Sequence, residues 1–332
     1  MGAYNVRTPL PLVKLKTLYP GQMGVNESDV PEGLRTGTEG KVIYVDPNYI
    51  GATTNPDGTD PQCPLSTVAS ALARCQDFRG DIILVMANDG WQYGPGTTDR
   101  TSIIAENVTV TVHGVSIIGV APSSPVGVIW RPATAGGVAC KIEALDVRVE
   151  GFAFCESLVG AGGGTGVFAE WDGSDYYGDN PVVANCYFGE GLDIGIQLEY
   201  VWNAIIERCA FHEIGYGIYC DPAEDGFGYS DIRGCWFQDC SSGAIAAAAT
   251  GCDENRVKDC TVFNASAQGG AAATNEGFDF TNGDDNMVAD CYFSCLLPVP
   301  ANGDIDDLCS AGATDAWVAN HCMNGLVVVN PT

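Results

Sequence analysis

Basic residues are scarce in this sequence. Lys and Arg number only 15 among 332 residues, whereas Asp and Glu number 42, and the formal net charge is −27. A chain this acidic repels phosphate groups, which argues against nucleic acids and anionic membrane surfaces as partners. Long apolar runs are also lacking, since no stretch approaches the roughly 18 apolar residues of a membrane-spanning helix. We therefore expect neither a nucleic-acid partner nor membrane insertion.

Familiar metal and thiol motifs are missing as well. The 15 cysteines include no CxxC pair, which excludes a zinc ribbon or a thioredoxin-type motif. The histidines His113, His212 and His321 are far apart in sequence and form no HxH or HExxH pattern. Two oxygen-rich segments, 46–60 and 301–307, offer ligands for Ca²⁺, but neither has EF-hand spacing, and solvated turns are the alternative. The sequence predicts no metal site and no other cofactor.

What the sequence does contain is a repeat. Five segments share an apolar residue, a Cys three positions later, and an aromatic or apolar residue two positions after the Cys. The cysteines are 23, 26, 25 and 31 residues apart, and the segments are VVANCYF (182–188), IIERCAF (205–211), DIRGCWF (231–237), RVKDCTV (256–262) and MVADCYF (287–293). Repetition at roughly 20–50 residues is typical of solenoids, in which each repeat packs on its neighbours.

Each repeat predicts two strands separated by a sharp corner. The Cys and the residue two positions later share one strand face, because side chains alternate along a strand. The apolar residue three positions before the Cys would face the other side unless the chain bends in between. The residue just before the Cys tolerates a left-handed backbone in four of five repeats, namely Asn185, Gly234, Asp259 and Asp290, while the fifth has Arg208. The repeat thus predicts an interior ladder of free cysteines with a packing role.

A third strand completes each rung of a three-sided coil. It follows a glycine in three repeats, at Gly195-Ile196, Gly217-Ile218 and Gly243-Ala244-Ile245. Weaker copies of the repeat extend the coil to both sides, over 116–121, 149–154 and 317–322.

A single helix is predicted near the start of the coil. The segment 64–78 has Ser66 or Thr67 as N-cap, and Val68 and Leu72 are spaced to share one face with Cys75. Because a solenoid must cover the open end of its core, we expect this helix to cap the first rung.

The repeats, with the stretch GKVIYVDPNYIGATTNPDGTDPQCPLSTVASALARC (40–75), resemble the pectate-lyase-like superfamily of right-handed parallel β-helices. The resemblance is closest to its bacteriophage members, which are tailspike-like and capsid decoration proteins, and it covers roughly residues 40–322. It implies an all-β fold: a single right-handed parallel β-helix with three strands per rung, a short N-terminal capping helix and an extended N-terminal arm. The domains expected are the arm over 1–40, the entry strand and helix over 41–95, and the coil over 96–332.

That superfamily also contains polysaccharide lyases and glycoside hydrolases, so the resemblance directs attention to paired carboxylates. TNGDDN (281–286) resembles the acidic motifs of polygalacturonases, although their GHG and RxK elements are missing, as is the Arg and Lys pair of pectate lyases. In a chain with 42 acids such clusters also arise as solvated turns. The candidate catalytic residues form two groups, Asp279, Asp284 and Asp285 in one, and Asp221, Glu224 and Asp225 in the other.

The first 26 residues differ in charge from the rest. They contain Arg7, Lys14 and Lys16 and no acid, which leaves −30 on residues 27–332 because the whole chain carries −27. Prolines and the alternation in LVKLKTLY (12–19) favour an extended arm that adds a strand to a neighbour, although a frayed tail is the alternative.

Two hypotheses of function follow. The first is a homotrimeric bacteriophage spike or decoration protein on the virion surface, held to capsid or tail proteins by its arms and in contact with host surface polysaccharide. The second is a polysaccharide-degrading lyase or glycoside hydrolase, or a depolymerising tailspike. The lack of a complete catalytic motif favours the first hypothesis.

Overall fold

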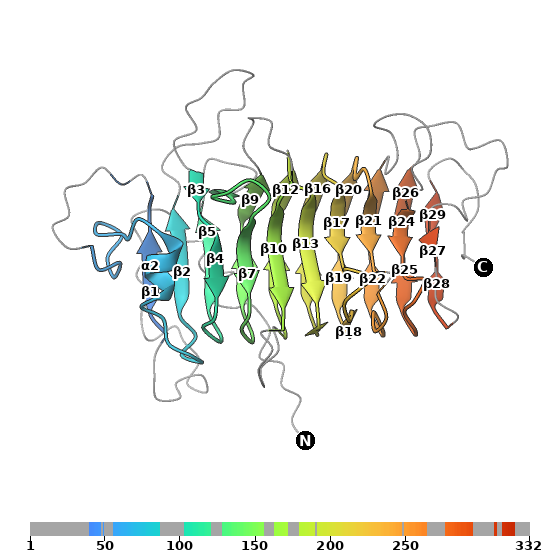
Figure 1. The fold of residues 1–332 in the computed structure, drawn as a ribbon, viewed down its shortest axis with the longest axis horizontal. Helices are drawn as coiled ribbons and strands as arrows, with labels where there is room; N and C mark the ends of the chain where they lie inside the picture. Colours follow the sequence, from blue (N-terminus) through green and yellow to red (C-terminus); the bar gives the residue numbers. More distant parts are fainter. Residues whose placement is uncertain are drawn as a thin grey trace, which may run out of the picture. The chain divides into compact units, whose positions relative to one another are not determined.

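The computed structural model describes residues 40–47, 49, 56–86, 103–120, 128–155, 163–171, 179–189, 191–247, 249–263, 276–294, 309–310 and 314–322. Residues 41–332 form one compact unit. Its strands are parallel to their neighbours, and most of them belong to three long sheets, which run side by side along the coil (Figure 1). The chain visits the first, second and third sheets in turn on each rung, so the unit is a parallel β-helix.

We name the three sheets A, B and C. Sheet A has the strand order β1 Val42–Val45, β2 Ile82–Met86, β5 Ser116–Val120, β8 Arg148–Glu150, β11 Val182–Ala184, β15 Ile205–Glu207, β19 Asp231–Arg233, β22 Arg256–Lys258, β25 Met287–Ala289 and β28 Ala316–Val318. Sheet B has β3 Ile103–Ala105, β6 Val128–Arg131, β9 Phe152–Cys155, β12 Tyr187–Gly189, β16 Ala210–His212, β20 Trp236–Gln238, β23 Thr261–Phe263, β26 Tyr292–Ser294 and β29 His321–Cys322. Sheet C has β4 Val108–Val110, β7 Val138–Ile142, β10 Thr165–Glu170, β13 Ile194–Glu199, β17 Tyr216–Tyr219, β21 Gly243–Ala246, β24 Glu276–Asp279 and β27 Cys309–Ser310. A small fourth sheet pairs β14 Val201–Trp202 with β18 Phe227–Gly228.

The repeat register predicted from the sequence is confirmed. The apolar position before the corner forms one interior column on sheet A, with Val183, Ile206, Ile232, Val257 and Val288 paired in succession. The position after the Cys forms a second column on sheet B, with Phe188, Phe211, Phe237, Val262 and Phe293. The rings of Phe188, Phe211 and Phe237 are nearly parallel, with successive centroids 5.0 and 4.7 Å apart.

The corner between sheets A and B is left-handed in all five repeats. Asn185, Gly234, Asp259 and Asp290 have φ angles of 51°, 60°, 54° and 53°, as their residue types predict. Arg208 adopts the same conformation, with a φ of 54°, although its type does not favour it. Its amide donates a hydrogen bond of 3.0 Å to the carbonyl of Arg233 on the next rung, so the coil imposes the corner on this residue.

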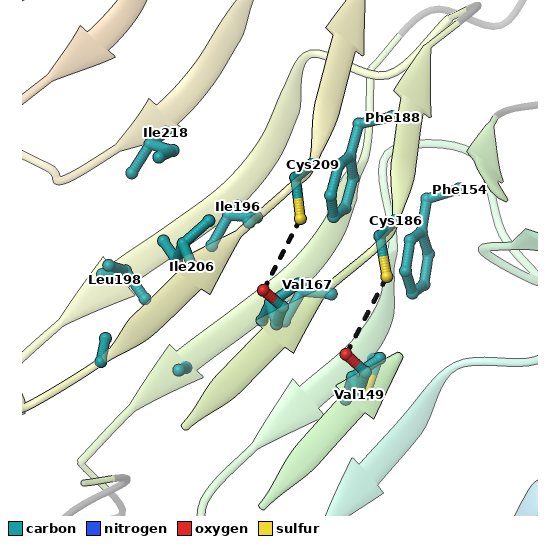
Figure 2. Packing of buried hydrophobic residues seen from close by; sticks show 14 of the residues in the cluster. Val149, Phe154, Val167, Cys186, Phe188, Ile196, Leu198, Ile206, Cys209 and Ile218 are labelled. Atoms are coloured by element: carbon teal, nitrogen blue, oxygen red, sulfur yellow. Dashed lines mark hydrogen bonds between the residues drawn. The ribbon is translucent and has the colours of Figure 1, made fainter. Parts of the chain in front are cut away.

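The ladder cysteines are buried free thiols, as predicted. They are Cys186, Cys209, Cys235, Cys260 and Cys291, and none is more than 3% exposed. Figure 2 shows Cys186 and Cys209 on successive rungs, beside the stacked rings of Phe154 and Phe188. Burial raises the pKa of the Cys209 thiol, which keeps it protonated and unreactive.

Glycine at the start of the third strand has a steric cause. A Cβ on Gly195 would lie 2.7 Å from both the ring of Phe211 and the carbonyl oxygen of Gly217. A Cβ on Gly217 would lie 2.6 Å from the ring of Phe237. The Phe column therefore occupies the space that a side chain would need at the second position of β13 and β17.

The single helix in the described part of the chain, α2 Val68–Leu72, is shorter than the predicted segment. Thr67 is its N-cap and accepts a hydrogen bond from the amide of Ser70, while Val68, Ala71 and Leu72 are buried in the core. Its capping of the first rung stays a prediction. Among the described residues, none of the helical structure has the length and apolar character needed to cross a membrane.

Candidate functional site

The carboxylates nominated from the sequence lie on the exterior of the coil, in or beside turns. Asp279 ends β24, and its Oδ1 accepts hydrogen bonds from the amide (3.0 Å) and the hydroxyl (2.6 Å) of Thr281. Asp221 follows β17, and its Oδ1 accepts a bond of 2.9 Å from the amide of Ala223. Both carboxylates thus stabilise the turn after their own strand, as Asx-turns do.

Asp284 and Asp285 support the turn between β24 and β25. The amide of Asp284 donates to Oδ1 of Asp253 (2.8 Å), and the amide of Asp285 donates to Oγ1 of Thr314 (2.9 Å). Asp285 has a φ of 58°, in the left-handed region that Asp tolerates better than most residues. Because Asp253 and Thr314 belong to the rungs before and after, these contacts bond successive rungs together. The backbone amides of this pair therefore have a structural role.

Asp221 and Glu224 belong to a larger acidic surface on sheet C. The strand register pairs Glu170 with Glu199 and continues to β17, which places Asp221 beside Glu199 on the next rung. Neighbouring strands lie about 4.8 Å apart, so the outward side chains of these three residues form one column. We call Glu170, Glu199, Asp221 and Glu224 the acidic cluster.

The acidic cluster affects the pKa of Glu199, which lies at the end of β13. Partial burial raises the pKa of its carboxyl, and the negative charges of Glu224, Asp221 and Glu170 raise it further, while a hydrogen bond of 2.5 Å from Gln197 opposes them. A carboxyl with a raised pKa beside ionised carboxylates is the arrangement that allows one group to act as an acid and another as a base.

Sequence reasoning missed Glu199 and Glu170, although a signal for them exists. In IGIQLE (194–199) the alternation places Ile196 and Leu198 in the interior and Glu199 outside. Clusters of carboxylates adjacent in sequence do not include these two residues. In a coil the neighbours of Glu199 are one rung away in the sequence: Glu170, 29 residues earlier, and Asp221, 22 residues later. Alignment of the third strands of successive rungs would have found the column.

Aromatic rings flank the acidic cluster. Trp171 follows β10, and its ring centroid lies 5.9 Å from that of Tyr200. The rings of Tyr216 and Tyr219 lie 4.6 Å apart on β17. Partial burial raises the pKa of Tyr219 to about 12, and the charge of Asp221 contributes, so its hydroxyl stays a donor at neutral pH. Carboxylates, hydroxyl donors and half-exposed rings are groups that can bind a sugar chain.

An open pocket of about 590 Å³ adjoins Tyr216 and Tyr219. It lies where the chain passes from sheet B to sheet C on successive rungs. Its polar lining comes from Asp193, Glu213, Asp239, Ser241 and Ser242.

Two of these pocket residues form a potential metal-binding group with His212. One ligand atom from each of His212, Glu213 and Asp239 lies within 4.8 Å of the other two. His212 and Asp239 are 27 residues apart in sequence, and they meet because β16 pairs with β20. Histidine motifs in the sequence do not reveal this group, since it contains only one His and takes its third residue from the next rung.

The cations of the predicted arm, Arg7, Lys14 and Lys16, lie outside the described residues, as does the segment 301–307. Within 46–60, the described part contains turns: Oδ1 of Asp57 accepts a bond of 3.0 Å from the amide of Thr59. Attachment by the arm and Ca²⁺ binding by these segments therefore stay predictions.

Comparison with known proteins bears on the fold. Residues 163–293 match the family model for a right-handed β-helix region. Together with the three parallel sheets, this match confirms the right-handed parallel β-helix. The fold that the resemblance to the pectate-lyase-like superfamily implied is therefore confirmed.

Similar solved structures include a rhamnogalacturonan lyase (12% identity, TM-score 0.37, covering 88% of this chain and 65% of that chain). They also include a protein of Geobacillus virus E2 (12%, 0.38, 84% and 60%) and an alginate lyase in complex with a trisaccharide (14%, 0.38, 76% and 54%). This chain spans less than two thirds of the length of each of the three. No curated protein matches the chain. These likenesses assign no activity to it.

Proposed function

We propose that this chain is a structural protein of a bacteriophage virion, a homotrimeric β-helix spike or decoration protein attached to the capsid or tail through residues 1–40. The charge distribution along the sequence supports the attachment, because three cations and no acids in residues 1–26 precede a body of −30. The turn contacts of Asp221 and Asp279 support a structural role, because each carboxylate accepts a hydrogen bond from the turn after its own strand.

The main support for a trimer is the uncharged, partly aromatic exterior of sheet B. Arg131 is the only Lys, Arg, Asp or Glu among the outward positions of its described strands. Trp236 and Tyr292 are 41% and 47% exposed on this face, and Phe263 lies edge-on to Trp236 at 5.8 Å. In a chain of −27, association of identical subunits is least opposed where charges are absent and most favoured where apolar area is buried. A threefold arrangement would bring three copies of this face together.

Two variants test the trimer. Trp236→Lys places a charge in the middle of the sheet B face, and we expect it to give monomers by light scattering coupled to size-exclusion chromatography. Tyr229→Lys is the matched control, since Tyr229 is 52% exposed but lies outside sheet B, and it should stay trimeric. A wild-type monomer, or a Trp236→Lys trimer, would contradict the proposed interface.

Deletion of residues 1–26 tests the attachment. The truncated chain should keep its β-sheet circular dichroism and its oligomeric state but lose co-sedimentation with phage particles. Binding that persists without these residues, or loss of the fold on their removal, would contradict an anchoring arm.

A polysaccharide-degrading activity is the second candidate, and the acidic cluster is the observation that favours it. Under the first proposal the purified protein does not cleave host or pectin-like polysaccharides. Release of unsaturated or reducing ends that disappears in Glu199→Gln, with the sheet A variant Glu207→Gln unaffected, would establish the second candidate in its place.

A further inference from the structure

The group His212, Glu213 and Asp239 is built by the rung repeat. Glu213 and Asp239 each follow the last residue of a sheet B strand, and both have left-handed φ angles, 52° and 54°. The amide of Glu213 donates to the carbonyl of Gln238 on the next rung, at 3.1 Å, so the two corners are stacked. Their side chains therefore project from the coil one strand spacing apart, which is about 4.8 Å.

Residues outside the group orient its side chains. The hydroxyl of Tyr187 lies 3.2 Å from Nδ1 of His212, and Nε2 of His212 lies 3.8 Å from Oε1 of Glu213. In the tautomer that donates Nδ1–H to the Tyr187 hydroxyl, Nε2 of His212 carries the lone pair that a metal ion needs. Nε2 of Gln238 donates a bond of 3.1 Å to Oδ2 of Asp239. Such outer contacts on a His and a carboxylate are typical of metal sites.

The spacing of the ligand atoms suits one ion. Ligands bound to Zn²⁺ at about 2.0–2.2 Å lie roughly 3–4 Å from one another, and the three atoms here are already within 4.8 Å. Small side-chain rotations bring them to bonding distance. A divalent cation also offsets the repulsion between the two stacked carboxylates, in a chain with a large excess of acid.

We propose that His212, Glu213 and Asp239 bind one divalent transition-metal ion, of the Zn²⁺ or Mn²⁺ class. One imidazole nitrogen and two carboxylates favour such an ion over Ca²⁺, which takes six to eight oxygen ligands. Three protein ligands leave coordination positions open, and Glu213 and Asp239 line the 590 Å³ pocket beside Tyr216. The open positions therefore face the pocket, where water or a hydroxyl group of a ligand completes the shell. This site does not involve the arm, but His212 lies on the same exterior face of sheet B as Trp236.

Titration of the full-length protein tests the site. After dialysis against EDTA, isothermal titration with Zn²⁺ should give one site per chain, and the same titration with Ca²⁺ should give at least tenfold weaker binding. His212→Ala and Asp239→Asn should each weaken Zn²⁺ binding by tenfold or more. Tyr187→Phe should weaken it by roughly tenfold, as loss of an outer contact does. The intensity of the visible absorption of the Co²⁺ form reports four-coordination.

The matched control is His321→Ala. His321 is exposed and stacks on Tyr292 at 5.2 Å on the same sheet, but it is not part of the group. Its removal should leave Zn²⁺ binding unchanged, and circular dichroism checks that every variant is folded. No Zn²⁺ binding by the wild type overturns the proposal. So does binding that survives in both His212→Ala and Asp239→Asn, which would place the ion elsewhere, for instance on thiols.

Discussion

Glu199 and Glu207 lie eight residues apart, on consecutive turns of the same coil, yet their surroundings shift the two pKa values in opposite directions. On sheet C, burial and the like charges of the acidic cluster raise the pKa of Glu199. On sheet A, burial also acts to raise the pKa of Glu207, but Arg233, at 2.8 Å, and the charges of Arg208 and Arg148 outweigh it and hold the pKa below its usual range.

The difference comes from the residues that stack in each exterior column. On sheet A, Glu207 and Arg233 are register partners, and the side chain of Arg148 pairs with Glu150 at 2.8 Å. On sheet C, Glu199 has Glu170 as its register partner. Opposite charges across neighbouring strands are stabilising and like charges destabilising. The coil thus fixes the interior columns but leaves each exterior column free. Glu170 forms an ion pair with Lys141 on the rung before it, whereas like charges surround Glu199, and such a like-charged neighbourhood is a candidate for function.

The largest loss of stability is expected in the interior of the coil, which sheets A and C both line. Ile232 is fully buried on sheet A, one residue before the exterior Arg233. Ile232→Asp buries an unpaired carboxylate and should cost several kcal/mol of unfolding free energy, on the order of severe core defects. Urea denaturation measures this cost. Arg233→Ala, its neighbour on the exterior, should cost about 1 kcal/mol or less. Equal stabilities for the two variants would show that the interior and exterior are assigned wrongly.

A smaller effect is expected in the cysteine ladder. Cys235 is 2% exposed between the sheet A and sheet B columns. Cys235→Ala removes one buried sulfur and should cost roughly 1–2 kcal/mol, as small core truncations do. Thiol titration of the native protein should detect none of the ladder cysteines before unfolding. Fast reaction of Cys235 in the native state would argue against the packed ladder.

These two variants test what the sequence could predict. The interior was predictable because an apolar residue, a Cys and a Phe recur at fixed spacing within the repeats. The columns from Val183 to Val288 and from Phe188 to Phe293 stack as expected. The corner at Arg208 was not, because rung-to-rung hydrogen bonding overrides the preference of that residue.

The exterior groups were not predictable from local motifs. Glu199 with Asp221, and His212 with Asp239, are brought together only by the register of sheets C and B. The number of residues between two stacked positions on successive rungs depends on the length of the turns, and the turns here vary in length. Asp284 and Asp285 are adjacent in sequence and looked like a catalytic pair, but their amides bond to different rungs.

The exterior of sheet A gives the next prediction. Glu207→Gln removes the charge that pairs with Arg233 and Arg208 and should destabilise the protein at pH 7 by about 1 kcal/mol or less, the range of solvent-exposed ion pairs. A lowered pKa in the folded state stabilises the fold above the unfolded-state value of about 4.3, and this contribution is lost as the pH falls through the folded value. The melting temperatures of wild type and variant should therefore converge as the pH falls below about 4.3. A difference that does not shrink over that range would contradict the charge pairing.

The smallest change in stability is expected at Glu199, and it tests directly whether Glu199 differs from Glu207. Its raised pKa means that the folded state takes up a proton more readily than the unfolded state, so ionised Glu199 weakens the fold at neutral pH. Glu199→Gln should therefore raise the melting temperature at pH 7, in contrast to Glu207→Gln. As the pH falls through the folded pKa, wild-type Glu199 becomes neutral and the advantage of the variant should disappear below about pH 4. Added salt should also reduce the advantage, because it screens the charges of Glu170, Asp221 and Glu224. If both substitutions destabilise the protein at pH 7, the acidic cluster is paired with cations as sheet A is, and the case for a functional surface on sheet C is lost.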